Sequence, residues 1–288
     1  MPLFGHRRYG RRRGGGLRLI IALAIALFGL IAYYTGTQEN PITGEPQRVG
    51  GILPADEVAI GYNTMPQLVS QMGGAVPESD PRAQRVQQIG RRLVEASGVG
   101  KGPYEFTFTL LDDPTTINAF ALPGGPVFIT VALYERLENE AQLAGVLGHE
   151  IGHVVHRHGA QRMAKAQLAG TLTLAAGVGA ADERGGAAMA AATAALAGQV
   201  IMMRYGREEE LQSDDQGLSY MISTGYDPRE MLHVMKVLRD ASGDGGRGPN
   251  FLQSHPHPDA RMDAIRRFIE TTYPSGVPPN LTKGASLR

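Results

Sequence analysis

The stretch His149-Glu150-Ile151-Gly152-His153 decides how this chain is interpreted, because it sets two histidines and a glutamate at a fixed spacing. On an α-helix, residues four apart lie one turn apart on the same face, so both imidazoles can reach one tetrahedral zinc ion. Glu150 then stands beside the metal, where it can take a proton from a metal-bound water. The pentapeptide therefore predicts a helix that carries a hydrolytic zinc site.

The residues around the pentapeptide predict that this helix is long and amphipathic. Asn139 is placed to cap its beginning, with Gln142 at the third helical position. Apolar side chains then recur at helical spacing, namely Leu143, Val146, Leu147, Ile151 and Val154. Both histidines of the pentapeptide thus fall on the predicted helix.

Two histidines and a water leave one zinc position for another protein ligand. His156 and His158 are the nearest candidates. Zinc proteases with a third histidine on the same segment need a glycine three residues after the second histidine and a histidine six after it. This chain has His156 and Gly159 at those places instead, so His156 and His158 are better interpreted as polar neighbours than as zinc ligands.

A distant carboxylate is the other candidate for the third ligand. In the acidic segment 207–217, Glu210 and Asp214 share one face of a predicted helix. Glu210 could bind zinc, and Asp214 could hold a ligand histidine through its other ring nitrogen. The alternative is a solvated acidic helix start, where carboxylates favour the positive end of the helix dipole. Composition alone does not choose between them.

The chain resembles the M48 family of zinc metallopeptidases. The matching residues are His149, Glu150, His153, Glu210 and Asp214. Segments 40–44, 118–125 and 144–148 agree as well, and the resemblance covers roughly residues 40 to 270. It is similar to the compact, envelope-located branch of the family. The resemblance implies one bound Zn²⁺ held by His149, His153 and Glu210, with Glu150 as general base and Asp214 orienting the site.

The resemblance also implies roles for residues that pattern alone would leave unassigned. Asn118 matches an asparagine that helps to stabilise the oxyanion beside bound substrate, and its alternative role is that of a turn residue after Asp113-Pro114. His255 matches a histidine that either contacts the transition state or occupies the open zinc position as a removable plug. Arg261 would pass for a surface charge, but its match suggests that it orients the loop of His255.

The remaining pattern predicts an α+β, mainly helical, zincin-type domain with a small β-sheet beside the metal helix. Asp80 and Pro81 begin an amphipathic helix that Gly98 ends. Alternating apolar residues over 104–110 predict a half-buried strand, and 127–131 predicts another. The sheet edge could take up substrate backbone as an added strand. Segment 164–203, rich in alanine and glycine, predicts a helical hairpin, either ordinarily packed or in contact with a membrane.

The N-terminus predicts a membrane anchor. Six arginines lie before residue 19, no acidic residue precedes Glu39, and the run 19–34 is apolar. We therefore expect a basic cytoplasmic N-terminus (1–18), an uncleaved transmembrane anchor (19–36), a linker (37–55), the peptidase domain (56–272) and a disordered tail (273–288). The chain has no cysteine, which excludes a thiolate ligand or disulfide, and its net charge of zero gives no reason to expect nucleic acid as a partner.

The expected function is a zinc endopeptidase that degrades misfolded or misassembled envelope proteins. By the positive-inside rule its catalytic domain would face the periplasm from a bacterial inner membrane. An inner mitochondrial membrane is the alternative, because an arginine-rich, acid-poor N-terminus also suits a presequence. A different class of function is a chaperone or assembly factor whose protease activity is latent because His255 closes the zinc site.

Overall fold

The computed structural model describes residues 15–180, 204–241 and 250–288. At the centre of the folded domain lies helix α5 (Glu140–Val155), whose residues are buried along its whole length. The side chain of Asn139 accepts a hydrogen bond from the backbone N–H of Gln142 at 3.0 Å, so the predicted cap is confirmed. The helix predicted around the pentapeptide is therefore present and buried.

A small sheet packs beside α5, as the sequence predicts, and it has three strands where the pattern indicated two. Its strands are β3 (Thr107–Leu111), β4 (Ala119–Ala121) and β5 (Pro126–Thr130). The order is β3-β5-β4, with β5 parallel to β3 and antiparallel to β4. A two-stranded antiparallel sheet joins β1 (Thr37–Glu39) to β2 (Pro46–Arg48). Small sheets beside many helices confirm the α+β, mainly helical fold class.

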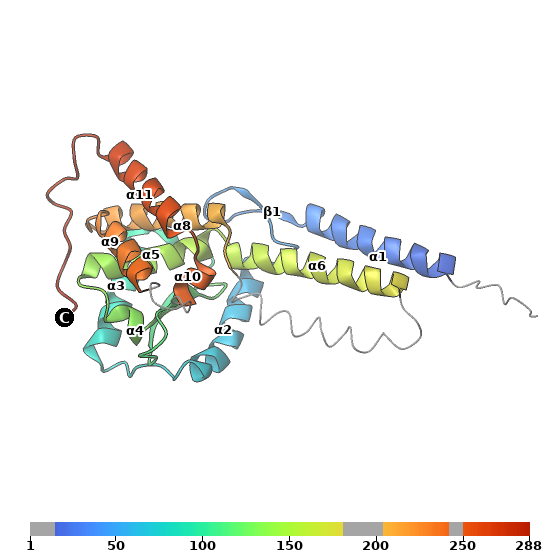
Figure 1. The fold of residues 1–288 in the computed structure, drawn as a ribbon, viewed down its shortest axis with the longest axis horizontal. Helices are drawn as coiled ribbons and strands as arrows, with labels where there is room; N and C mark the ends of the chain where they lie inside the picture. The colour runs from blue at the N-terminus through green and yellow to red at the C-terminus, as the bar shows by residue number, and fades with distance from the viewer. Residues whose placement is uncertain (1–14, 181–203, 242–249) are drawn as a thin grey trace, which may run out of the picture.

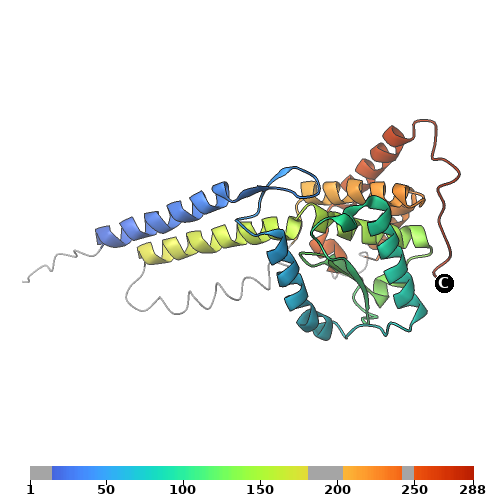
Figure 2. The same ribbon diagram turned by 180° about the vertical axis from the view of Figure 1, so that it is seen from behind.

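Helices surround the sheet and α5 in the domain seen in Figures 1 and 2. They are α2 (Pro54–Gln71), α3 (Pro81–Ser97), the 3₁₀ turn η1 (Val99–Lys101), α4 (Val131–Tyr134), α8 (Arg207–Ser223), α9 (Glu230–Asp240), α10 (Asn250–Ser254) and α11 (Pro258–Thr272). Helix α3 begins and ends as predicted, because Asp80 accepts a hydrogen bond from the N–H of Arg82 and Gly98 adopts a positive φ of 75°. The apolar faces of these helices bury one large core, and a second, smaller cluster packs against α2.

Glycines allow α5 and α8 to cross at very short range. A Cβ added to Gly152 would lie 3.0 Å from the Cα of Ser213, and one added to Gly217 would lie 2.9 Å from the backbone nitrogen of His149. Any larger side chain at these two positions would push the helices apart. The close crossing is what brings the acidic face of α8 to the histidines of α5.

The segment expected to be a linker is folded onto the domain. Asn40, only 2% exposed, donates from Nδ2 to the carbonyl of Val155 at 2.8 Å. Gln47 on β2 donates to the carbonyl of His156 at 2.9 Å. Both acceptors lie at the C-terminal end of α5, where helix carbonyls have no intrahelical partner. The β1–β2 hairpin therefore supplies hydrogen-bond donors to carbonyl groups at the C-terminal end of α5.

The C-terminal segment is also ordered, which corrects the expectation of a disordered tail over 273–288. The backbone N–H groups of Glu140 and Ala141 donate to the carbonyls of Ala285 and Lys283 at 3.0 and 2.9 Å. These donors belong to the first turn of α5 and have no partner inside the helix. The composition of the tail suggests disorder because it contains three prolines and few large apolar residues. Its order comes from backbone capping, which composition does not reveal.

Two helices extend away from the domain side by side. Helix α1 (Gly15–Thr35) and helix α6 (His158–Ala180) project from the same side in both views. Among the described residues, α1 is the helix long and apolar enough to cross a membrane. Helix α6 forms the first arm of the predicted alanine-rich hairpin. The second arm, within 181–203, and most of the basic N-terminus, 1–14, lie outside the described residues.

Candidate metal centre

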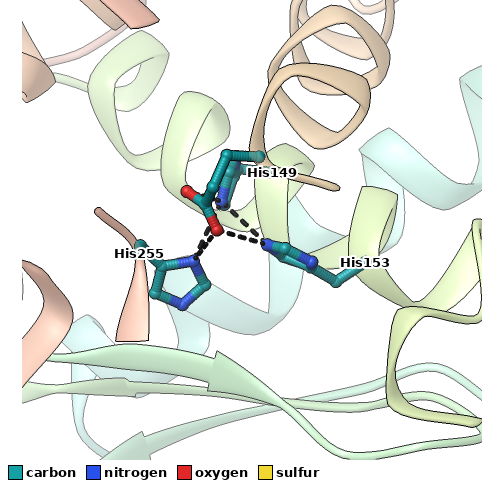
Figure 3. A group of neighbouring side chains, drawn as sticks. His149, His153 and His255 are labelled. Carbon is teal, nitrogen blue, oxygen red and sulfur yellow. Dashed lines mark hydrogen bonds and ion pairs between the residues drawn. The ribbon is translucent and has the colours of Figure 1, made fainter. Parts of the chain in front are cut away.

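Three histidines and a glutamate from three helical segments meet in the domain interior. His149 and His153 come from α5, Glu210 from α8 and His255 from the residue after α10. One potential ligand atom from each of the four lies within 4.8 Å of those of the others, and all four side chains are buried. Figure 3 shows the three histidines pointing toward one another. The structure thus brings the sequence-predicted residues to one point.

The separations within this cluster suit a single tetrahedral ion. His149 Nε2 lies 3.0 Å from His153 Nε2, 3.2 Å from His255 Nδ1 and 3.6 Å from Glu210 Oε2. Glu210 Oε1 lies 3.5 Å from His153 Nε2 and 3.0 Å from His255 Nδ1. Two ligand atoms of tetrahedral zinc stand about 3.3 Å apart, given bonds of about 2.0–2.1 Å. The cluster therefore fits Zn²⁺ in both donor chemistry and spacing.

Asp214 and Arg261 fix the orientation of His149. Asp214 Oδ1 lies 2.8 Å from His149 Nδ1, so it accepts the ring proton there and leaves Nε2 with a free lone pair toward the cluster. Arg261 donates to both oxygens of Asp214, at 2.6 and 2.7 Å, and its third nitrogen lies 2.6 Å from Glu210 Oε2. The guanidinium is fully buried. It therefore links the carboxylate of Glu210, the predicted ligand, to the carboxylate of Asp214.

These charges set the ionisation of the two carboxylates. Burial alone would raise the pKa of Glu210, but the neighbouring His255 and Arg261 hold that pKa well below its ordinary value. In Asp214, burial is likewise outweighed by Arg261 and His149, and its pKa is lowered. Burial depresses the pKa of His153 well below its usual range. Neutral imidazoles and ionised carboxylates are the forms that bind a metal.

His158 orients His153 through a chain of hydrogen bonds. His158 Nε2 lies 3.1 Å from Gln212 Oε1, which can only accept, so His158 donates there and its Nδ1 carries a lone pair. That Nδ1 lies 2.9 Å from His153 Nδ1, which must then be the donor. The chain leaves His153 Nε2 free to bind a metal. Burial lowers the pKa of His158 to about 4, which keeps it neutral.

The sequence analysis did not find this role for His158, which it treated as a polar neighbour. We expect His158→Ala to weaken zinc binding by about 10- to 100-fold, because loss of such a partner frees the ligand ring to tilt. Competition with a zinc chelator measures this affinity. His156→Ala is the matched control, since His156 is also buried in the same turn but its ring contacts none of the candidate metal ligands among the described residues. Equal affinity in wild type and His158→Ala would refute this role.

Glu150 lies beside the cluster but is not among the four converging groups. Its side chain is fully buried, and neither carboxylate oxygen finds a hydrogen-bond partner among the described residues. Oε1 stands 3.6 Å from His255 Nε2. Burial raises the pKa of Glu150, although His255 and His149 oppose the rise. An unpaired buried carboxylate with a raised pKa is suited to accept a proton.

His255, the residue after α10, completes the cluster. Its ring stacks on Phe251 with centroids 4.3 Å apart, and its Nδ1 lies within 3.2 Å of both His149 Nε2 and Glu210 Oε1. This is the place where a fourth ligand would stand.

Two further residues complete the surroundings. Asn118 precedes the edge strand β4, is 2% exposed, and its Oδ1 has no hydrogen-bond partner among the described residues. It is not one of the four converging groups. Tyr205, which no sequence pattern indicated, stacks on His153 with ring centroids 3.7 Å apart. An aromatic residue just before α8 carries no recognisable signal, because the stacking depends on the crossing of distant helices.

Comparison with known proteins identifies the class. The family model "Peptidase family M48" matches residues 80–269, and the chain belongs to this family. It is 36% identical over 212 residues, 72% of its length, to the beta-barrel assembly-enhancing protease of Escherichia coli (strain K12), and 33% identical over 214 residues to that of Yersinia pestis. Mitochondrial metalloendopeptidase OMA1 of Schizosaccharomyces pombe is 25% identical over 255 residues, 85% of this chain and 70% of that protein.

The matched relatives are longer than this chain. The alignments cover 43% of the Escherichia coli and Yersinia pestis proteins. The resemblance to the M48 family is confirmed, and the matched range contains α5, α8 and His255, which together supply all four converging groups.

Proposed function

We propose that this chain is a zinc-dependent endopeptidase that cleaves misfolded or misassembled proteins of a membrane-bounded envelope. The single observation that carries the proposal is the convergence of His149, His153, Glu210 and His255, with ligand atoms at 3.0–3.6 Å, beside the unpaired carboxylate of Glu150. Such a set of buried polar atoms is costly without an ion that binds it. Membership of a peptidase family supports the hydrolytic role.

Each residue has a task in this proposal. His149, His153 and Glu210 would hold a zinc ion, which would polarise the scissile carbonyl and lower the pKa of a water. Glu150 would take a proton from the water as its oxygen bonds to the carbonyl carbon, and would return that proton to the amine nitrogen as the carbon–nitrogen bond breaks. Asn118, at the start of the edge strand, would donate its amide N–H groups to the developing oxyanion. Asp214 and Arg261 hold the ligands in position.

The substrate class and location rest on helix α1 and on the relatives. α1 is the described helix suited to cross a membrane, and we propose that it anchors the chain in a bacterial inner membrane with the catalytic domain in the periplasm. The names of the relatives refer to β-barrel assembly and to mitochondria. The bacterial envelope and the mitochondrion both contain membrane proteins that can misassemble, which favours protein quality control as the role of this chain.

Cleavage of an unfolded protein tests the proposal. We would incubate the full chain, in a mild detergent, with casein and identify the products by mass spectrometry. The proposal predicts internal fragments, their loss on chelation and their return when zinc is added. Products trimmed only from the ends, or cleavage insensitive to chelation, would contradict it.

The position of His255 favours a latent state as a second candidate, in which the chain acts as a chaperone or assembly factor until the histidine withdraws. We expect His255→Ala to raise the rate of casein cleavage on the order of tenfold, because the variant loses contacts worth about 1.5 kcal/mol or more that favour the closed form. His257→Asn in the same loop is the control, since His257 is exposed and asparagine tolerates its positive φ of 67°. A fall in rate would instead assign His255 to the transition state.

A further inference from the structure

Helix α6 contacts α1 along a regular seam. On α1, the less exposed positions are Ala22, Ile25, Ala26, Gly29 and Tyr33, which recur every three or four residues. On α6 the corresponding positions are Ala164, Leu168, Thr171, Ala175 and Val178. Both sets follow the period of one helical face. The two helices therefore pack lengthwise and antiparallel, as Figures 1 and 2 show.

Small residues allow α1 and α6 to approach each other closely along this seam. A Cβ added to Gly29 would lie 2.7 Å from Cγ2 of Thr171, so the two backbones approach at this point. Close crossing through small residues is the typical packing of helices within a bilayer, where apolar side chains gain nothing by leaving lipid. The contact also fixes the relative depth of the helices, because it places Thr171 level with Gly29.

The outer surface of α6 suits lipid as well. No charged residue follows Lys165 in the helix, and Leu172 and Leu174 are 38% and 41% exposed. The hydroxyls of Thr171 and Thr173 donate to carbonyls one turn earlier, at 2.9 and 2.8 Å. Their polar groups are thus satisfied within the helix, which hydrocarbon requires. Large apolar side chains are exposed on α1 as well, among them Leu23, Leu27 and Phe28.

From these contacts we infer that the distal part of α6, from Gln167 onward, lies in the hydrocarbon of the same bilayer that α1 crosses. The inference rests on the anchor in the proposed function. Gly29 lies six residues from the end of α1, about 9 Å along the helix, and α6 continues nine residues past Thr171, about 14 Å more. The end of α6 then reaches about 23 Å into a core about 30 Å thick.

The position of α6 in the bilayer would place the proposed metal centre close to the membrane. Helix α6 begins at His158, whose ring contacts the ligand His153, and only two residues separate α6 from α5. The metal helix is therefore joined almost directly to a membrane-embedded helix. The proposed site lies near the membrane surface, where segments of membrane proteins emerge.

Depth-dependent fluorescence quenching tests the placement. Because the chain has no cysteine, single cysteines can be introduced by Leu174→Cys on α6, Leu27→Cys at a matched depth on α1, and Arg91→Cys on the exposed face of α3. Each full-length variant is labelled with an environment-sensitive fluorophore and reconstituted into phosphatidylcholine and phosphatidylglycerol vesicles. Lipids with a mid-chain doxyl group then quench labels that lie in hydrocarbon.

We expect the labels at Leu174 and Leu27 to be quenched to a similar extent and the label at Arg91 to be unaffected. A label at Leu174 that behaves like the one at Arg91, while Leu27 is quenched, would place α6 in water and overturn the inference. Absence of quenching at Leu27 would remove the anchor and the inference with it. Casein cleavage by the same preparations reports separately on the proposed enzymatic function.

Discussion

Replacing Glu150 with glutamine is expected to lower kcat/KM for peptide hydrolysis by about 100- to 10,000-fold, the usual contribution of a general base. Glutamine keeps the shape of the side chain but cannot accept the proton of a water. Glu150 is not among the four converging groups, so zinc content should remain that of wild type. Casein cleavage together with metal analysis of the same sample measures both quantities.

A matched control and a chaperone assay sharpen this test. Glu208→Gln changes an exposed carboxylate at the start of α8 and should leave cleavage unchanged. If the chain acts mainly as a chaperone, Glu150→Gln should still suppress aggregation of an unfolded protein. Cleavage at the wild-type rate by Glu150→Gln would show that another residue is the base.

Arg261→Met is expected to lower the free energy of unfolding by about 3–5 kcal/mol, the usual cost of removing one partner of a buried ion pair. Arg261 is fully buried between Glu210 and Asp214, at 2.6 Å from each. Without it, two carboxylates remain buried with their main compensating charge removed. Denaturant titration of the metal-depleted full chain in detergent measures the change.

An exposed arginine in the same helix provides the comparison. Arg266, 48% exposed, pairs with Asp263 at 2.7 Å, and Arg266→Met should cost less than about 1 kcal/mol. Added zinc should recover part of the stability lost in Arg261→Met, because the ion would compensate the charge of Glu210. Equal unfolding free energies for the two variants would contradict the role of Arg261.

The parts of the site that follow local spacing could be predicted from the sequence. His149 and His153 lie one turn apart on one helix, and Glu210 and Asp214 do so on another, so the helical period alone pairs them. Which helix faces which depends on the close crossing at Gly152 and Gly217, which no local pattern encodes. His255 and Arg261 entered the predicted site only through the family resemblance. Their positions are set by a loop and a helix far along the chain.

The fold was predictable to a similar extent. The caps at Asn139 and Asp80 and the glycine stop at Gly98 are local signals, and each lies where the sequence indicated. The β1–β2 hairpin and the C-terminal tail were underestimated, because both are held by backbone and amide hydrogen bonds to the two ends of α5. Predicting such contacts requires knowing which unpaired donors and acceptors lie nearby in the folded chain. The role of His158 was missed for the same reason.

We propose that one zinc ion lies between α5 and α8, held by His149, His153 and Glu210. Anomalous diffraction at the zinc absorption edge, from crystals of the full chain in detergent, tests it most directly. We expect one strong anomalous peak about 2.0–2.2 Å from His149 Nε2, His153 Nε2 and an oxygen of Glu210. Zinc bound elsewhere in the chain, or no peak here after incubation with zinc, would contradict it.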